Sequence, residues 1–440
     1  MSVPIRRRQL AAIALASVAV LATATACSDD SSGGSSSGDS DGPVTLVVDV
    51  FGDQGFGYED LYKQYEAEHK NVKIQERGKG LGLGDYNTRL TQQITAGSGA
   101  GDVVALEEGT IVQFYAQADK FVNLADHGAN DLKGNFLPWK WEQGTTPDGK
   151  VLGLGTDVGS MALCYRSDLF KAAGLPTDRE QVGALWPTWD QFIATGQKFA
   201  AADKKHKFVD SATNFYNVVL MQVAGQGTGY TYYDKSNKLV IDQNPDVKSA
   251  YDLTTKMIGA GLSNNLQSFS NEWNAGFKNG TFATIACPAW MTGVIKGQAG
   301  DAAAGKWDIA KAPGNGGNWG GSFLGVPKSS KHQKEAAELA KFLTSAQGQI
   351  GAYKAVGNLP SNPQALADPA VADSTNEYFS KAPVGKIFAA GASDLKPVYL
   401  GPKNNAVRTA VENTLRAVEQ GKSADEQWQA ALKNGAAAGK

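Results

Sequence analysis

Residues 44–50 read VTLVVDV, an apolar run rich in β-branched residues that predicts a buried strand. Two more strand-like stretches follow, at 72–75 and at 102–106. Apolar residues recur at helical spacing between these strands, over 58–65 and over 86–94. This β-α-β-α-β order predicts a doubly wound, mostly parallel α/β sheet, with ligands expected beyond the carboxyl ends of its strands.

The N-terminus predicts export. Arg6, Arg7 and Arg8 precede an uncharged, mostly apolar run that ends in three small residues before Cys27. This order is typical of a signal peptide over 1–26, because the apolar part is too short for a spanning helix. The cysteine after small residues resembles the lipobox of bacterial lipoproteins, which implies that Cys27 is lipidated and anchors the protein to the outer face of the cytoplasmic membrane. Ordinary secretion with loss of Cys27 is the alternative.

The next residues form a tether. Residues 28–42 are only Ser, Gly and Asp, which cannot enter a core, so 27–42 is interpreted as the lipidated cysteine and a flexible linker. About 400 residues remain, more than one core usually supports, and two lobes are expected.

Charge and motifs exclude several classes of function. The chain has 42 Lys and Arg against 44 Asp and Glu; removal of the signal peptide takes away three Arg and leaves a net charge of about −5. The mature chain has no Lys/Arg cluster, which argues against nucleic acid as a partner. The four His are scattered, no catalytic or phosphate-binding motif is present, and no metal or cofactor is expected. Cys164 and Cys287 could form a disulfide in an oxidising compartment or remain two buried thiols.

Three stretches carry a resemblance to a known family. They are VLGLGTDVGSMALCYRSDLF at 151–170, FKNGTFATIACPAW at 277–290 and GVPKSSKHQKEAAELAKFLTS at 325–345. In this order they resemble the family 1 extracellular solute-binding proteins of bacterial ABC importers, the group that contains maltose- and other oligosaccharide-binding proteins. Arg166 and Ser167 depart from the Asn-Lys that the family commonly has there.

The resemblance implies a periplasmic-binding-protein-like fold of two α/β lobes joined by a crossover hinge. Lobe I is then expected over 43–158 and 284–329, and lobe II over 159–283 and 330–440. Both Cys164 and Cys287 fall in crossover segments, which the family places side by side, so the resemblance favours a disulfide between them.

The family's function implies that a sugar binds in the cleft, where aromatic faces stack on the ring and carboxylates or amides bind the hydroxyls. Asp157 stands at the position of the family's ligand-binding carboxylate, and Trp290 at that of its stacking tryptophan. The other candidates follow strands or lie in cleft loops, whereas Trp189 and Trp428 lie on helical stripes and are assigned to packing. The complete set of predicted ligand-binding residues is Phe51, Asp53, Glu108, Asp157, Trp273, Asn274, Trp290, Trp319 and Asn358.

The resulting hypothesis is a monomeric binding component of an ABC importer that captures a di- or oligosaccharide. It has no catalytic residues and delivers its ligand to permease subunits that work with a cytoplasmic ATPase. Two alternatives stay open. A secreted glycoside hydrolase would use a pair of carboxylates, and a surface polysaccharide-binding protein would present an open aromatic platform.

Overall fold

The computed structural model describes residues 42–440 except 315, 393 and 394. The predicted signal peptide, Cys27 and all of the tether but its last residue lie outside the described residues. Within the described part of the chain, no helix has both the length and the apolarity that a membrane crossing requires.

The first sheet is built around the strand predicted at 44–50. Its β1 pairs in parallel with β2 and β3, whereas β9 runs antiparallel to its neighbours β3 and β4. All strands of this sheet except β9 therefore point the same way, as a doubly wound sheet requires. In sheet order the strands are β2 (Val72–Arg77), β1 (Val44–Asp49), β3 (Val103–Glu107), β9 (Ser322–Gly325) and β4 (Leu154–Gly155).

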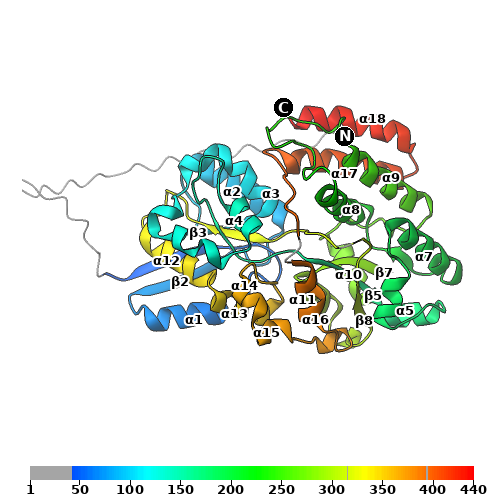
Figure 1. Ribbon diagram of the computed structural model, residues 1–440, viewed down its shortest axis with the longest axis horizontal. Helices are drawn as coiled ribbons and strands as arrows, with labels where there is room; N and C mark the ends of the chain where they lie inside the picture. Colours follow the sequence, from blue (N-terminus) through cyan, green and yellow to red (C-terminus); the bar gives the residue numbers. More distant parts are fainter. Residues whose placement is uncertain (1–41, 315, 393–394) are drawn as a thin grey trace, which may run out of the picture. The chain divides into compact units, whose positions relative to one another are not determined.

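The second sheet has one reversed strand as well. Its β7 pairs in parallel with β6, and β5 runs antiparallel to both β7 and β8. In sheet order the strands are β6 (Lys207–Val209), β7 (Phe282–Pro288), β5 (Met161–Arg166) and β8 (Trp307–Ala310). Two mixed α/β sheets confirm the predicted fold class (Figure 1).

Helices connect and cover the strands, and their apolar stripes face the cores. Tyr62 and Tyr65 on α1, and Leu90 and Ile94 on α2, are buried as their spacing predicted. The α-helices up to β7 are α1 (Glu59–Glu68), α2 (Leu83–Ala96), α3 (Glu108–Ile111), α4 (Pro138–Gly144), α5 (Ser167–Ala172), α6 (Arg179–Ala184), α7 (Trp189–Ala202), α8 (Ala212–Gln226), α9 (Pro245–Gly259) and α10 (Asn271–Asn279).

The remaining helices lie after β7 or are short 3-10 helices. The α-helices are α11 (Met291–Ala299), α12 (Gln333–Leu343), α13 (Ala346–Val356), α14 (Pro363–Ala367), α15 (Pro369–Ala372), α16 (Val384–Ala392), α17 (Asn404–Glu419) and α18 (Ala424–Ala438). The 3-10 helices are η1 (Val112–Lys120), η2 (Leu124–His127), η3 (Ala129–Asn135), η4 (Asp301–Ala303) and η5 (Glu377–Phe379).

The sheets divide the chain differently from the expected lobe segments at two places. Strands β7 and β8 lie within 284–329 almost entirely, yet they belong to the second sheet because they pair with β5. Helix α12 lies within 330–440, yet its apolar stripe, including Leu339 and Leu343, is buried in the core of the first sheet. This helix, yellow in Figure 1, lies beside β3. Contacts between segments that are far apart in the chain therefore decide which sheet each of these elements joins.

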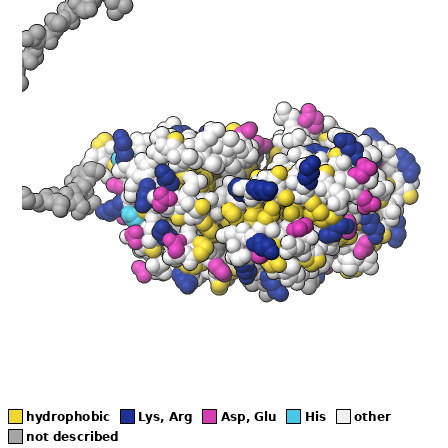
Figure 2. Space-filling view, turned by 90° about the horizontal axis from the view of Figure 1, so that it is seen from above, with side chains coloured by type: hydrophobic (Ala, Val, Ile, Leu, Met, Phe, Trp, Pro, Cys, Tyr) yellow, Lys and Arg dark blue, Asp and Glu magenta, His cyan; other side chains and the backbone are white. Residues whose placement is uncertain are grey.

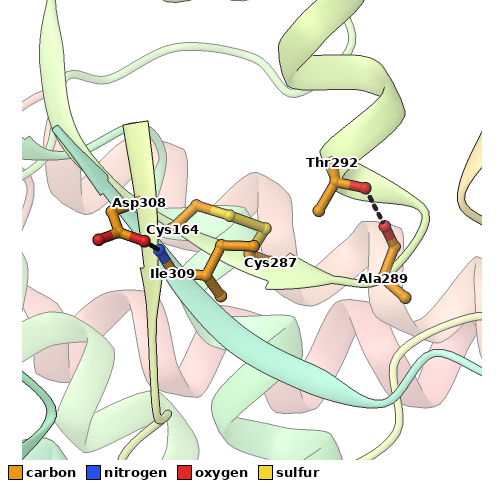
Figure 3. Close-up of a disulfide and its surroundings, with 6 residues drawn as sticks. All are labelled: Cys164, Cys287, Ala289, Thr292, Asp308 and Ile309. Carbon is orange, nitrogen blue, oxygen red and sulfur yellow. Dashed lines mark hydrogen bonds between the residues drawn. A yellow bond between two sulfur atoms is a disulfide. The ribbon is translucent and has the colours of Figure 1, made fainter. Parts of the chain in front are cut away.

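Cys164 and Cys287 form a disulfide inside the second sheet, with their Cα atoms 5.4 Å apart. Figure 3 shows it joining β5 to β7, diagonally across an antiparallel pair in which Ala162 faces Cys287. Both cysteines are fully buried. The predicted disulfide is confirmed, but it links two strands of one sheet rather than the two sheets.

Charged side chains of both signs cover the face seen in Figure 2. Lys and Arg are interleaved there with Asp and Glu, and hydrophobic side chains gather in a band between them. This arrangement gives that face no extended surface of one sign, of the kind that attracts a polyanion.

Candidate functional site

Two connecting segments, 156–161 and 317–322, run side by side between the two sheets, and we call them the crossover pair. The backbone nitrogen of Trp319 donates a hydrogen bond to the carbonyl of Gly159 at 2.9 Å. A Cβ on Gly159 would lie 1.8 Å from the Trp319 carbonyl oxygen. Only glycine therefore allows the two backbones to approach this closely.

Asp157 lies in the crossover pair and is only 5% exposed. Its Oδ1 accepts hydrogen bonds from the Thr156 hydroxyl at 2.7 Å and from the backbone nitrogen of Ser322 at 2.9 Å. The carboxylate predicted to bind ligand thus holds the two crossover segments together. Its backbone also bridges to Pro360.

Glu108 directly follows β3, as predicted, and is 3% exposed. Its carboxylate accepts hydrogen bonds from the Asn318 side-chain amide at 2.7 Å and from the backbone nitrogen of Gly320 at 2.8 Å. Burial, together with the negative charge of Glu107, raises the pKa of Glu108 to about 8. Glu108 therefore contacts the crossover pair from the first sheet.

Lys140, on α4, is a fully buried lysine close to these carboxylates. Its ammonium lies 3.9 Å from the centre of the Phe323 ring, and its Nζ has no hydrogen-bond partner among the described residues. Burial lowers the pKa of Lys140 to about 8, although the negative charges of Asp157 and Glu108 act to raise it.

Three aromatic rings meet beside the crossover pair, from Phe269, Trp290 and Trp319, and we call them the aromatic cluster. The Trp290 and Trp319 ring centres are 5.5 Å apart, and the Trp290 indole nitrogen donates to the Trp319 carbonyl at 3.2 Å. Phe269 lies nearly parallel to Trp290 at 6.3 Å. Phe269 is 53% exposed, whereas both tryptophans are half-buried. The cluster offers apolar ring faces next to the connection between the sheets.

Trp273 packs against this cluster from the protein interior and has no exposed ring face. It lies in the first turn of α10, is fully buried, and packs against Phe269, with ring centres 4.9 Å apart. Its indole nitrogen donates to Asp210 Oδ2 at 2.7 Å. Trp273 was predicted to bind ligand from a loop, but it lies on α10, which packs this ring into the core of the second sheet; its contact with a ligand stays a prediction. Asn274, the next residue on α10, is half-buried.

The loop after β1 carries two of the predicted residues. Phe51 is half-buried and packs edge-on against Phe56, with ring centres 5.1 Å apart. Asp53 is exposed and accepts a hydrogen bond from the Gln298 side chain of α11 at 2.8 Å. This bond joins a loop of the first sheet to a helix that follows β7 of the second.

Asn358 is half-buried on the turn between α13 and α14. The adjacent Leu359 carbonyl accepts a hydrogen bond from the backbone nitrogen of Val158 at 2.9 Å. The structure therefore brings the Asn358 turn against the crossover pair, close to Asp157.

Sequence reasoning missed three residues of this region: Phe269, Asn318 and Lys140. Phe269 was detectable as the only aromatic residue in the polar loop SNNLQSFS at 263–270. Asn318 and Lys140 carry no local signal, because their roles depend on contacts with segments far away in the chain.

Two α/β sheets connected by paired crossover strands define the periplasmic-binding-protein class of fold. The family profile described as bacterial extracellular solute-binding protein matches residues 60–378. A solved extracellular solute-binding protein of family 1 is 40% identical, with a TM-score of 0.80, over 90% of this chain and 100% of that one. The chain belongs to the family of bacterial extracellular solute-binding proteins. The protein is accordingly exported.

Curated relatives are binding proteins. The lactose-binding protein of Rhizobium radiobacter is 27% identical over 296 residues, 64% of this chain and 66% of that protein. The arabinooligosaccharide-binding protein of Bacillus subtilis (strain 168) is 27% identical over 306 residues, 66% of each protein. The chain thus spans just under two thirds of the length of these relatives. A solved binding protein from B. animalis subsp. lactis, in complex with β-1,6-galactobiose, shares the fold. It is 23% identical, with a TM-score of 0.75, over 90% of this chain and 98% of that one.

Proposed function

We propose that this protein captures a di- or oligosaccharide at the aromatic cluster and delivers it to an ABC permease. The observation that carries the proposal is the exposed Phe269 ring, which lies against Trp290 beside the crossover pair. Apolar ring faces stack on the C–H faces of a sugar, whereas an ion or a small amino acid has no comparable surface. The names of the two curated relatives, for lactose and for arabinooligosaccharide, support the same ligand class.

Binding needs contacts from both sheets and no chemical step. The ligand rests on the aromatic cluster, and groups from the loops of the first sheet, such as Asp53 and Phe51, complete its enclosure. Because these contacts coexist only when the two halves are closed, the sugar shifts the population toward the closed state. The permease then distinguishes loaded from empty protein. In this proposal the protein is no enzyme, and its sugar leaves unchanged.

Three further features belong to the same proposal. Cys27 is lipidated and holds the protein on the outer face of the cytoplasmic membrane, and residues 28–42 act as the tether. The protein works as a monomer, with permease subunits and a cytoplasmic ATPase as partners. Its lobes follow the sheets, so that β5 to β8 belong to lobe II, and β9 and α12 belong to lobe I.

A thermal-shift screen tests the ligand class. The panel contains lactose, arabinotriose, β-1,6-galactobiose and maltose, with an amino-acid mixture as the control. A ligand that binds only the native state raises its melting temperature, by an amount that grows with concentration. We expect a shift with at least one saccharide and none with amino acids. No shift with any saccharide would overturn the proposal, and recovery of a hydrolysed sugar after incubation would favour the glycoside hydrolase instead.

A further inference from the structure

Glu108 is hydrogen-bonded to one segment of the crossover pair through both of its carboxylate oxygens. Its Oε2 accepts from the Asn318 side-chain amide and its Oε1 from the backbone nitrogen of Gly320, so each carboxylate oxygen faces a donor. The backbone nitrogen of Glu108 itself donates to the Gly321 carbonyl at 3.0 Å. These three contacts hold the residues on either side of Trp319, which belongs to the aromatic cluster.

The orientation of the Asn318 amide is set by a second contact. Its Oδ1 accepts from the backbone nitrogen of Gly159 at 2.8 Å, on the opposite crossover segment. Its Nδ2 must therefore point at Glu108, and it also donates to the Gly320 carbonyl at 3.0 Å. Turning the amide to suit a protonated Glu108 would place its nitrogen against the Gly159 nitrogen. The hydrogen-bond pattern thus requires Glu108 to accept at both oxygens, as only the ionised carboxylate does well.

Three charged groups from different elements act on Glu108: Glu107 at the end of β3, Lys140 on α4 and Arg408 on α17. Burial raises the pKa of Glu108 and Glu107 raises it further, while Lys140 and Arg408 act to lower it. The hydrogen bonds therefore favour the carboxylate while burial favours the acid, and protonation is brought closer to neutral pH.

We propose that ionised Glu108 is a positioning residue that holds Asn318 and Gly320, and through them Trp319, in the aromatic cluster, and that its protonation releases Trp319. When a proton binds one carboxylate oxygen, that oxygen becomes a hydroxyl facing an N–H donor, and one of the two hydrogen bonds is lost. No other reactant is needed. The consequence for ligand affinity rests on the proposed function, whereas the release of Trp319 does not.

The first test needs no ligand. Tryptophan fluorescence of the full chain is followed from pH 5 to pH 9.5 for the wild type, Glu108→Gln and Trp319→Phe. In the wild type we expect a transition centred well above the pKa of an ordinary glutamate. Glu108→Gln cannot accept at both positions, so it should show the low-pH signal throughout, and Trp319→Phe should lose most of the amplitude. A wild type without a transition, or the same transition in Glu108→Gln, would overturn the proposal.

Two neighbouring substitutions serve as matched controls, because each changes a charge near Glu108 without removing either hydrogen bond. Glu107→Gln removes a negative charge and should move the midpoint to lower pH. Lys140→Met removes a positive charge and should move it to higher pH. Shifts in the same direction, or no shift in either variant, would contradict Glu108 as the titrating group.

Hydrogen exchange gives a second measurement on the wild type alone, in case Glu108→Gln fails to fold. After correction for intrinsic exchange, protection of the Gly320 amide should fall at least fivefold as the pH drops through the fluorescence midpoint. Amides of β1 in the same protein should keep their protection. Equal protection of the Gly320 amide on both sides of the midpoint would contradict the proposal, whatever the behaviour of Glu108→Gln.

A third experiment tests whether Glu108 affects ligand binding. It measures the Kd for the saccharide found in the thermal-shift screen as a function of pH. Between pH 9 and pH 5.5 we expect the Kd of the wild type to rise about tenfold and that of Glu108→Gln to stay level. If no saccharide binds, the proposed function fails while the ligand-free transition still decides the role of Glu108. Binding whose pH dependence is equal in both proteins would refute only the positioning role.

Discussion

At the scale of single residues, Phe269 stands out because it is a large apolar side chain left 53% exposed. Its backbone is in the left-handed region, with a φ of +64°, which bulky residues rarely adopt. Such conformations persist where the surroundings hold them, and here Trp273 and Trp290 pack against the ring. An exposed, held ring suits stacking on a sugar.

Substitution of the cluster residues should weaken sugar binding with little loss of folding. We expect Trp290→Ala to lower affinity at least tenfold, about 1.4 kcal/mol, and Phe269→Ala to lower it about threefold to tenfold, because each removes a stacking face. Isothermal titration with the saccharide from the screen measures both. Trp428→Ala, on α18 against Tyr251, is the control and should bind normally. Unchanged affinity in Trp290→Ala would refute its assignment.

Asp210 shows how a buried carboxylate supports this region. It accepts hydrogen bonds from Trp273 and, at 2.5 Å, from the Asn214 side chain. Burial is the largest influence and raises its pKa from 3.8 to about 7, although both hydrogen bonds act to lower it. The folded state therefore keeps a proton on Asp210 over a pH range in which the unfolded chain has lost it.

The stability of Asp210→Asn relative to the wild type should increase with pH. Between pH 4 and pH 7 the folded wild type binds more protons than the unfolded chain, so its stability falls as pH rises through this window. Asparagine keeps an acceptor for Trp273 and has no proton to lose. The difference in free energy of unfolding should grow by up to about 4 kcal/mol, measured by urea unfolding. Trp273→Phe keeps the carboxylate, and its stability should still fall with pH.

At the scale of elements, the long amphipathic helices were predictable and the short strands were not. The apolar stripes of α1 and α2 are buried as their spacing indicated, because all residues of one helix face come from a single short stretch of sequence. Strands β8 and β9 have four residues each and carry no periodicity that distinguishes them from loops. They are strands because β8 pairs with β5 and β9 pairs with β3. These partners are far away in the sequence, so the local pattern does not reveal the pairing.

Removal of the disulfide between β5 and β7 should destabilise the fold and spare the site. It closes a chain segment of 123 residues, so Cys164→Ala/Cys287→Ala should lose about 2–5 kcal/mol of unfolding free energy in urea. Because both cysteines lie within the second sheet, sugar affinity should stay within about threefold. The wild type unfolded under reducing conditions is the control and should match the double variant. A large loss of affinity would instead connect this bond to the hinge.

At the scale of the whole molecule, the hydrophobic residues form separate cores around the two sheets. One cluster surrounds the first sheet, and two others cover the second. The crossover pair and the turn of Asn358 connect the sheets; hydrogen bonds join them, and Val158 and Leu359 belong to the third cluster. Because the first sheet keeps a core of its own, a hinge closure can leave its packing intact.

Saturating sugar should therefore reduce the radius of gyration measured by small-angle scattering, because the closed state gains contacts from both sheets. Trp290→Ala at the same sugar concentration should contract less, since fewer of its molecules are loaded. A sugar that binds tightly in titration yet leaves the scattering curve unchanged would contradict closure.

Residue type and position predicted several residues that the structure brings to this region, whereas their contacts with a ligand stay predictions. Trp290 and Trp319 were predicted as partners of a ligand, and the structure brings their rings together. Glu108 was placed correctly after its strand and Asp157 in the crossover, and both carboxylates accept hydrogen bonds from the crossover pair. Trp273 lies on α10 rather than in the loop that was predicted, and only the packing of α10 decides that this ring faces the core.

Local pattern was sufficient for the α/β class, for export, for the family resemblance and for most helix faces, since each of these is encoded over a few neighbouring residues. Tertiary structure alone decided which sheet received β7, β8 and α12, which carboxylate holds the crossover pair, and which ring remains exposed. The strand pairings and the carboxylate hydrogen bonds join segments more than a hundred residues apart, and the exposure of Phe269 depends on how its loop packs against Trp273 and Trp290. Their free energies come from burial and hydrogen bonding that exist only after the chain has folded.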